Sequence, residues 1–585
     1  MDVDLTGQVW EGKKSPTWSH GDPAFGSGLV AWPGVSQKGL ECSRSRGGPG
    51  RLHGGHPATV RRWRGGSPRC VIWSGGLRRL WSWRARCGAF QGGLMKDAVE
   101  ATSGVLGKPG PLDIGTRAGA RLLIEAVELV AHHAEAVAEG PVAPAEPESG
   151  RIRDWLAGHD FSGPRPAGEV LAEVTAALRR WGVHATHPRY LGLFVPTPTW
   201  WGIAGELVAA GVNPQLAAYE HAPAAVEIER HVLRFLAGRL GLPPAADGNF
   251  TTGGAEANLT AVVVALTRHF PAYPDAGLTA LRGQPVLYAS AESHLAWLKI
   301  AQMTGLGRRA VRLVPVDSAG RMDIARLRDL YDGDVAAGRT PFLLVGTAGT
   351  TGGGAVDPLP ELARLAAAWG LHFHVDAAWA GAAALSDRLR PLLAGVERAD
   401  SVTVDAHKWL SAPMGAGIFL TAHPGALAES FRVSTGYMPP DSDTAPDPYR
   451  TGVQWSRRFA GLKVFLALAA AGRGAFARQV ERDTELGILL ARRLAEDGWP
   501  RINDSPLPVI CVADPGAEAH GPDRSDAWHA AVVAHVVRGG RAWISRVRLD
   551  GRPAIRLCVT SHRTRAHDIE IAVAALGEAR AATPY

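Results

Sequence analysis

The middle of the chain alternates between two hydrophobic patterns, one with the period of a strand and one with the period of a helix. Short apolar runs bounded by polar residues or glycine predict buried strands, and longer stretches between them have apolar residues at helical spacing. This alternation predicts a largely parallel sheet with helices on its faces. The expected strands are 285–289, 310–315, 341–346, 371–375, 401–404 and 416–420, and the expected helices are 255–268, 294–304, 323–330 and 358–368.

The pattern differs on either side of this region. The residues before it predict two amphipathic helices, 117–139 and 167–181, and then a shaped loop, HPRYLGLFVPTPTWWG. The residues after 440 predict a smaller α+β domain. Its expected helices are 457–471, 474–496, 525–538 and 566–577, and its expected strands are 507–512, 542–547 and 554–558. We therefore predict an N-terminal helical segment (110–205), a large domain (206–440) and a small domain (441–585), preceded by an extension (1–94).

Residues 1–94 have no sustained helical or alternating pattern, so we do not expect a folded domain there. They contain seven of the nineteen tryptophans and three of the five cysteines, without paired C-x-x-C spacing. Met95 is a candidate alternative start. Residues 1–94 have a net charge of +9, whereas residues 95–585 have a net charge of −2. The positive charge of the whole chain therefore does not indicate that residues 95–585 bind nucleic acid. A nucleic-acid partner would depend on this extension alone.

The rest of the composition is that of a soluble globular protein, with 46% apolar and 20% charged residues. No apolar stretch is long enough to predict a membrane span, and the chain does not begin with a secretory signal pattern. Cys511 and Cys558 lie in apolar, strand-like runs and are expected to be buried thiols. We therefore expect a cytoplasmic protein.

A glycine turn at the start of an expected helix is the first candidate for chemistry. In FTTGGAEANLTAVVVAL, Gly253 and Gly254 precede the helix and would let a ligand approach the backbone closely. Free N–H groups at a helix N-terminus suit a phosphate. A glycine-rich turn before a core helix is an equally good interpretation of these residues alone, and no Walker-type lysine follows.

Two charged residues at expected strand ends are the next candidates. Asp376, in HFHVDAAWAG, could be a metal ligand, a helix cap or the counter-ion of a ring nitrogen. Lys408, in SVTVDAHKWL, lies 32 residues later and could form a Schiff base with an aldehyde. A phosphate site, a carboxylate and a lysine are the protein's contributions in pyridoxal 5′-phosphate enzymes.

From about residue 110 to 580 the chain resembles the group II pyridoxal-phosphate decarboxylases, which include the aromatic-L-amino-acid, glutamate, histidine and diaminobutyrate decarboxylases. The resemblance rests on HVDAAWAG, VDAHKWL and RRFAGLK. It implies an α/β fold of the PLP-dependent transferase type (fold type I), pyridoxal 5′-phosphate as cofactor and no metal. It also implies carboxy-lyase activity on an L-amino acid, giving an amine and CO2. The family is dimeric with shared active sites, and helices 117–139 and 167–181 would help build the interface.

The resemblance also implies roles around the cofactor ring. Lys408 would hold the cofactor's aldehyde as an imine, and Asp376 would pair with the ring nitrogen. His294, in ASAESHLAWLKIA, would stack on one ring face, and Ala378 would pack against the other. Thr351, in GTAGTTGGG, matches a threonine near the cofactor and the stacking histidine.

Further roles concern the phosphate and the proton that replaces CO2. Gly254 and Ala255, together with Gly253, would bind the phosphate through the backbone, and His407 would support that end. Tyr437 lies in FRVSTGYMPPDSDTAPDPYR, a polar, proline-rich segment long enough to act as a lid. It matches the loop tyrosine that returns a proton to the substrate.

The substrate is less well defined by the sequence. Four aromatics suit an aromatic side chain, whereas Glu220 and His221 suit a polar or basic one, and Ala217 replaces a bulky aromatic of aromatic-specific relatives. Arg556 and Arg563 could bind a carboxylate, as an aminotransferase requires. We expect aromatic amino acid decarboxylation; the alternatives are another decarboxylase substrate, aldehyde synthesis, transamination or a non-catalytic scaffold. The four aromatics are Phe194, Trp200, Trp201 and Tyr219.

Overall fold

The structure is a computed structural model that describes residues 110–146, 148–433, 435–438 and 446–585. The chain separates into two units, Met1–Lys108 and Pro109–Tyr585. The expectations for residues 1–94 and Met95 lie outside the described residues. Among the helices that the structure describes, none combines the length and the apolar character needed to cross a membrane.

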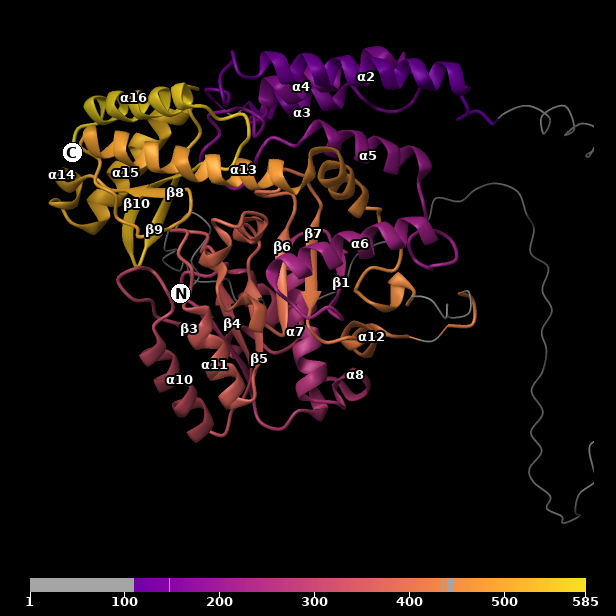
Figure 1. Ribbon diagram of the computed structural model, residues 1–585. Coiled ribbons are helices and arrows are strands. Elements are labelled where there is room, and N and C mark those ends of the chain that lie inside the picture. The colour runs from indigo at the N-terminus through magenta and orange to yellow at the C-terminus, as the bar shows by residue number, and fades with distance from the viewer. Residues whose placement is uncertain (1–109, 147, 434, 439–445) are drawn as a thin grey trace, which may run out of the picture. The chain divides into compact units, whose positions relative to one another are not determined.

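The second unit is built around a seven-stranded, mostly parallel sheet, as the sequence predicts (Figure 1). Strand β7 runs antiparallel to both of its neighbours, and the other strands share one direction. Strand β1 was not predicted, because its sequence DGNFT has a single large apolar residue. The spatial order is β1 (Asp247–Thr251), β7 (Gly417–Thr421), β6 (Ser401–Asp405), β5 (His372–Asp376), β4 (Thr340–Thr347), β2 (Pro285–Ser290) and β3 (Val311–Val314).

Helices cover both faces of this sheet because alternate strand residues point to opposite sides. Val286, Tyr288 and Leu344 join the hydrophobic core shared with one set of helices. Their neighbours Leu287 and Leu343 join a second core on the other face. The first set comprises α6 (Pro223–Leu240), α10 (Ile324–Ala336) and α11 (Leu359–Trp369); the second comprises α7 (Gly254–His269) and α9 (Ala296–Met303).

The N-terminal segment is helical, as expected. The helices are α2 (Thr116–Ala136), α3 (Ser149–Ala157), α4 (Ala167–Trp181) and α5 (Trp200–Val212). Helices α2 and α4 are in contact, and no residue of α2, α3 or α4 is buried in the described part of the chain. Helix α5 begins inside the segment expected to be a loop, after Thr199 caps it by accepting a hydrogen bond from the N–H of Gly202.

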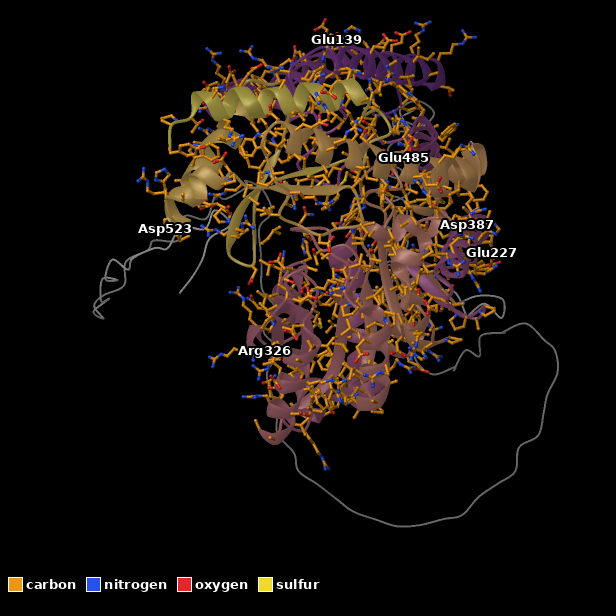
Figure 2. All side chains as sticks on the ribbon, turned by 60° about the vertical axis from the view of Figure 1, so that its left-hand side comes forward. Glu139, Glu227, Arg326, Asp387, Glu485 and Asp523 are labelled. Carbon is orange, nitrogen blue, oxygen red and sulfur yellow. The ribbon has the colours of Figure 1, made fainter. Side chains whose placement is uncertain are left out.

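The C-terminal residues form a three-stranded antiparallel sheet packed on helices. The two helices expected over 457–496 are both present within α13 (Gly461–Glu496), on either side of a kink at Gly472 (φ 73°, ψ 154°). Strand β9 begins at Ser545, three residues later than expected. Figure 2 shows charged side chains such as Glu485 and Asp523 on the outside of the ribbon. The remaining elements are β8 (Val509–Val512), β9 (Ser545–Leu549), β10 (Arg552–Cys558), α8 (Tyr273–Ala276), α12 (Ala426–Phe431), α14 (Pro515–Glu518), α15 (Pro522–Arg538) and α16 (Ala566–Ala582).

Candidate active site

The candidate residues follow strands that end at the same edge of the large sheet. Gly417, the first residue of β7, pairs with Thr251 on one side and Asp405 on the other, so β1 and β6 end in one row. Strands β2, β4 and β5 are parallel to β6. The loops after these strands bring candidate groups to the carboxyl edge of the sheet, where ligands bind in open α/β folds. These groups are Gly253, Gly254, His294, Thr351, Asp376 and Lys408.

Lys408 is paired with a carboxylate from the strand that precedes it. Its Nζ lies 3.0 Å from Oδ2 of Asp405, whose side chain is 2% exposed. The other carboxylate oxygen, Oδ1, is buried without a hydrogen-bond partner among the described residues. A buried carboxylate is costly unless it is paired, so the lysine and the aspartate depend on each other. This ion pair was not predicted from the sequence.

The glycine turn forms an uncapped helix N-terminus, as the sequence predicts. Gly253 caps α7 without any side-chain hydrogen bond. A Cβ at Gly254 would lie 2.8 Å from Oδ2 of Asp405, so a side chain there would meet a buried group. The ring of His407 lies 3.5 Å from the position of a Cβ at Gly253, and its Nδ1 accepts a hydrogen bond from the N–H of Ala416. Burial lowers the pKa of His407.

Asp376 ends β5 and is buried. Its Oδ2 accepts a hydrogen bond from Nδ2 of Asn258 (2.8 Å), and its Oδ1 accepts one from the N–H of Ala378 (3.1 Å). The carboxylate is therefore held on both oxygens. Sequence reasoning missed Asn258, although a polar residue on the buried face of the expected helix was a usable signal.

His294 is an exposed residue near both charged centres. It lies in the loop after β2 and interacts electrostatically with Asp376, Lys408 and Asp405. Surrounding protein atoms reduce its hydration and lower its pKa, the two carboxylates oppose this shift, and Lys408 adds to it. The structure thus brings Lys408, Asp376 and His294 into one site.

Two predicted residues are not joined to this centre by described contacts. The backbone carbonyl of Thr351 accepts a hydrogen bond from Nη1 of Arg556. Tyr437 is 77% exposed, and its ring stacks on Trp455 with centroids 6.0 Å apart. Among the described residues, no hydrogen bond, ion pair or ring contact joins either side chain to Lys408.

The aromatics expected to form a substrate pocket do not gather in one place. Phe194 is buried and stacks on Trp379, with centroids 4.4 Å apart. Trp200 and Trp201 are about half exposed on α5 and line a cavity of about 350 Å³ beside Trp409, which neither Phe194 nor Tyr219 lines. Glu220 and His221 are exposed, and Ala217 is buried.

The two arginines have different surroundings. Arg556 is buried, and its guanidinium lies 5.6 Å from the centroid of the Phe194 ring. It donates hydrogen bonds to the carbonyl of Gly192 (2.8 Å) and to Oγ of Ser545 (3.1 Å), and the described residues provide it with no ion pair. Arg563 donates to the carbonyl of Ala134 (2.6 Å), which ties α2 to the small domain.

These groups fit pyridoxal 5′-phosphate. Two observations favour an anionic ligand that approaches the backbone. No side chain caps the N-terminus of α7, and there is no room for a Cβ atom at Gly254. Asp376 presents a held carboxylate, and Lys408 is an amine only partly exposed to solvent.

Comparisons with known proteins agree with this geometry. Residues 163–511 match the family model described as the pyridoxal-dependent decarboxylase conserved domain. The chain is 28% identical to the aromatic-L-amino-acid decarboxylase of Bacillus atrophaeus, over 76% of this chain and 92% of that protein. It is 31% identical to the L-2,4-diaminobutyrate decarboxylase of Rhizobium meliloti (strain 1021), over 71% and 83%.

Solved structures show the same fold. Mouse CSAD in its apo form superimposes with a TM-score of 0.74 at 27% identity, covering 80% of this chain and 99% of that one. Oryza sativa TDC with PLP and tryptamine superimposes with a TM-score of 0.77 at 24% identity, covering 81% and 99%. The match of more than half of the chain, on a fold that brings Lys408 and Asp376 into one site, shows that this protein belongs to the pyridoxal-dependent decarboxylase family, as a carboxy-lyase that uses pyridoxal 5′-phosphate to decarboxylate an amino acid.

Proposed function

We propose that this protein is a cytoplasmic homodimer that decarboxylates an aromatic L-amino acid to its amine and CO2. The observation that supports the chemistry is the meeting of Lys408, Asp376 and His294 beside the uncapped start of α7. Each group has a separate task in this proposal. The tasks are to hold the cofactor, to orient it, and to supply or remove protons.

The first task is to hold the phosphate and the aldehyde. When bound, the cofactor supplies an aldehyde that bonds to amines and a ring that accepts the electron pair left behind by CO2. The N–H groups of Gly254 and Ala255 would donate to the phosphate at the start of α7, next to Gly253, and His407 packs beside the turn. Lys408 provides the amine.

The second task is to orient the ring and keep its nitrogen protonated. Asp376 pairs with that nitrogen, because an ionised carboxylate favours a cationic neighbour. The hydrogen bonds from Asn258 and the N–H of Ala378 fix the direction of the carboxylate. His294 would stack on one ring face and Ala378 would pack against the other, so that the two residues would hold the ring from both sides.

The third task is to return a proton to the α-carbon of the substrate after CO2 has left. Tyr437 is the proposed donor. Its side chain is exposed, and closure of the surrounding segment over the site would exclude water during the reaction. His294 is a second candidate for proton transfer, and Thr351 would support the cofactor near it.

The aromatic preference rests on the stacked pair of Phe194 and Trp379, since Trp379 follows Ala378 directly in the chain. A polar or acidic substrate is the second candidate. The buried charge of Arg556, which no described carboxylate compensates, favours an acidic side chain. The similarity to a diaminobutyrate decarboxylase favours a polar side chain. Aldehyde synthesis and transamination remain further alternatives on the same cofactor.

The homodimer is supported by apolar side chains that the single chain leaves uncovered. Leu123, Ile124 and Val127 of α2 are each more than half exposed. Trp200 and Trp201 of α5 are similarly exposed. Exposed apolar surface of this kind marks an interface, and a second copy covering it could complete the active site.

The experiment joins cofactor attachment to product formation. The purified protein is loaded with pyridoxal 5′-phosphate, reduced with borohydride and mapped by mass spectrometry; we expect a pyridoxyl group on Lys408 and none in Lys408→Ala. Lys299→Ala, which changes an exposed lysine outside the site, serves as the control. A panel of aromatic, acidic and diamino acids with CO2 detection then identifies the substrate. An unlabelled Lys408 would overturn the proposal, and CO2 release from acidic amino acids alone would favour the second candidate.

Asp376→Asn tests the role of the carboxylate. The variant should keep most of its cofactor but lose turnover, because the neutral amide no longer favours a protonated ring nitrogen. Cofactor occupancy and turnover are measured on the same sample. Turnover close to that of the unchanged protein would defeat the assigned role.

A further inference from the structure

A buried polar stripe runs along the face of the sheet that α7 covers. On β5 it consists of His372, His374 and Asp376, and on β6 it includes Ser401 and Thr403; all five are buried. The residues between them, including Phe373, Val375, Val402 and Val404, belong to the hydrophobic core on the other face. Polar groups buried in a sheet interior are costly unless they are hydrogen-bonded, so each of these residues requires a hydrogen-bond partner.

The polar groups form one continuous chain of hydrogen bonds that ends on Asp376. Nε2 of His372 lies 2.8 Å from Oγ of Ser401, and the same oxygen lies 2.8 Å from Nδ1 of His374. Nε2 of His374 lies 3.2 Å from Oδ1 of Asn258 and 3.3 Å from Oγ1 of Thr403. The amide of Asn258 then donates from Nδ2 to Oδ2 of Asp376 at 2.8 Å. The chain thus links the start of β5 to its end.

The carboxylate sets the direction of every hydrogen bond in this chain. Because an ionised Asp376 can only accept, Asn258 must donate through its amide nitrogen and accept through Oδ1. The Nε2 of His374 must therefore carry a proton, which leaves Nδ1 as the acceptor of the Ser401 hydroxyl. That hydroxyl oxygen is then free to accept from Nε2 of His372.

The reverse arrangement is less favourable. If Ser401 donated to His372, Nδ1 of His374 would carry the proton and its bare Nε2 would face Oδ1 of Asn258, so that two acceptors would meet. The Thr403 hydroxyl could donate to that bare Nε2, but Oδ1 of Asn258 would still lose its donor. A doubly protonated imidazole would avoid that clash, but burial opposes it. Burial lowers the pKa of His374 well below its ordinary value and that of His372 to about 4. Both rings are therefore neutral, and all four donors point toward the carboxylate.

We infer that His374 is a positioning residue for the carboxylate that faces the cofactor ring nitrogen, acting through Asn258, with its tautomer set by Ser401 and His372. This inference rests on the proposed role of Asp376. A carboxylate that receives an aligned donor chain is stabilised in its ionised form, because hydrogen-bonded groups polarise one another in a poorly hydrated interior. The ionised form in turn favours a protonated ring nitrogen. The chain also prevents the amide of Asn258 from turning its oxygen toward Asp376.

Conservative variants separate this role from simple packing. His374→Leu removes the donor to Asn258. His374→Gln retains an N–H close to the position of Nε2 and should restore the function. Ser401→Ala is a smaller change that removes the group selecting the tautomer, and it keeps the test usable where His374→Leu fails to fold. His529→Leu is the matched control, since His529 is a buried histidine whose partners, Asp514 and Ser525, lie in the small domain.

The readout is the protonation of the cofactor ring, followed by nitrogen NMR on protein loaded with pyridoxal 5′-phosphate that carries a 15N label in the ring. We expect the ring nitrogen of His374→Leu to lose its proton about half to one pH unit lower than in the unchanged protein. Ser401→Ala should shift in the same direction by less. His374→Gln and His529→Leu should stay within about 0.3 unit, which is below the effect of one typical hydrogen bond.

Cofactor affinity gives a second measure. The dissociation constant for pyridoxal 5′-phosphate should rise by about two- to tenfold in His374→Leu and remain close to its starting value in His374→Gln. Ring protonation that is unchanged in both His374→Leu and Ser401→Ala would overturn the inference. An equal shift in His374→Gln and His374→Leu would overturn it too, because packing rather than donation would then be responsible. If the protein without substitutions fails to attach the cofactor at Lys408, the proposed function itself is refuted.

Discussion

The amine of Lys408 and the carboxylate of Asp405 lie 3.0 Å apart in a turn of four residues at the end of β6. The same carboxylate limits the space at Gly254, where the phosphate is proposed to bind. One buried group therefore contacts both the lysine and the phosphate turn. In the sequence Asp405-Ala406-His407-Lys408, the end of the strand, the supporting histidine and the lysine therefore lie in a single turn.

The ion pair should contribute to the stability of the cofactor-free protein. Lys408→Ala leaves Asp405 buried with no cation, so we expect the free energy of unfolding to fall by about 1–3 kcal/mol. Adding Asp405→Asn removes the unpaired charge and should recover part of the loss. Urea titrations of the cofactor-free single and double variants measure this, with Lys299→Ala as a control within about 0.5 kcal/mol. A double variant no more stable than Lys408→Ala would contradict the pairing.

The two glycines of the turn should respond differently to an added methyl group. A Cβ at Gly254 meets Oδ2 of Asp405 at 2.8 Å, whereas a Cβ at Gly253 meets the His407 ring at an ordinary 3.5 Å. Gly254→Ala should therefore weaken binding of pyridoxal 5′-phosphate by about tenfold or more, since such overpacking costs at least about 1 kcal/mol. Gly253→Ala should stay within about threefold. Equilibrium dialysis compares the two, and equal losses would argue against the crowding at Gly254.

Asp483 should make stability fall as the pH rises toward neutrality. It is buried beside Trp409, whose indole N–H donates to it at 2.9 Å, and burial raises its pKa to about 7. Between the ordinary pKa of an aspartate and about 7, the unfolded chain has released this proton while the folded protein still holds it. Asp483 therefore lowers the free energy of unfolding across that window, by up to about 4 kcal/mol.

Asp483→Asn removes this dependence. At pH 8 the variant should be more stable than the unsubstituted protein. At pH 4 it should lose most of that advantage, because the folded protein then carries a neutral, protonated Asp483. Urea unfolding at several pH values between 4 and 8 measures the difference. An advantage that stays constant across this range would show that the proton on Asp483 is not the cause.

Tyr437→Phe tests the proposed proton donor without disturbing the fold. Because the side chain is mostly exposed, the free energy of unfolding should change by less than about 0.5 kcal/mol, and the cofactor should load normally. Amine formation should slow, and part of the flux should go to oxidative or transamination products. Chromatography of the products provides the measurement. Tyr449→Phe, at a buried tyrosine nearby, is the comparison, and an unchanged amine yield from Tyr437→Phe would exclude the role.

The strands at 285–289 and 341–346 were predictable because buried parallel strands favour nearly continuous apolar runs, and the strand at 401–404 was predictable because its β-branched residues favour an extended backbone. Strand β1 was missed because pairing with β7, rather than its own composition, makes DGNFT extended. The break predicted between residues 471 and 474 is confirmed, since the chain leaves helical geometry at Gly472, where glycine tolerates a positive φ. Local pattern was therefore reliable where apolar content was high and unreliable where neighbours determined the conformation.

The candidate site shows the same division. Lys408, Asp376 and the glycine turn follow from residue types at strand and helix ends, read together with the family motifs. The aromatic pocket could not be predicted, since Phe194 and Trp200 are near in sequence but belong to a buried stack and an exposed helix. Asn258 and the partners of Asp376 were equally invisible, because a residue's hydrogen bonds depend on which elements pack across it.

By itself, the sequence determined which residues carry chemistry and which segments are buried, since charge, side-chain type and hydrophobic period are local properties. Only the tertiary structure decided that Asp405 holds Lys408, and that His372, Ser401, His374 and Asn258 form a single chain toward Asp376. These contacts join residues up to 118 positions apart. They exist because two parallel strands and the helix above them place buried polar groups where each must find its partner in another element.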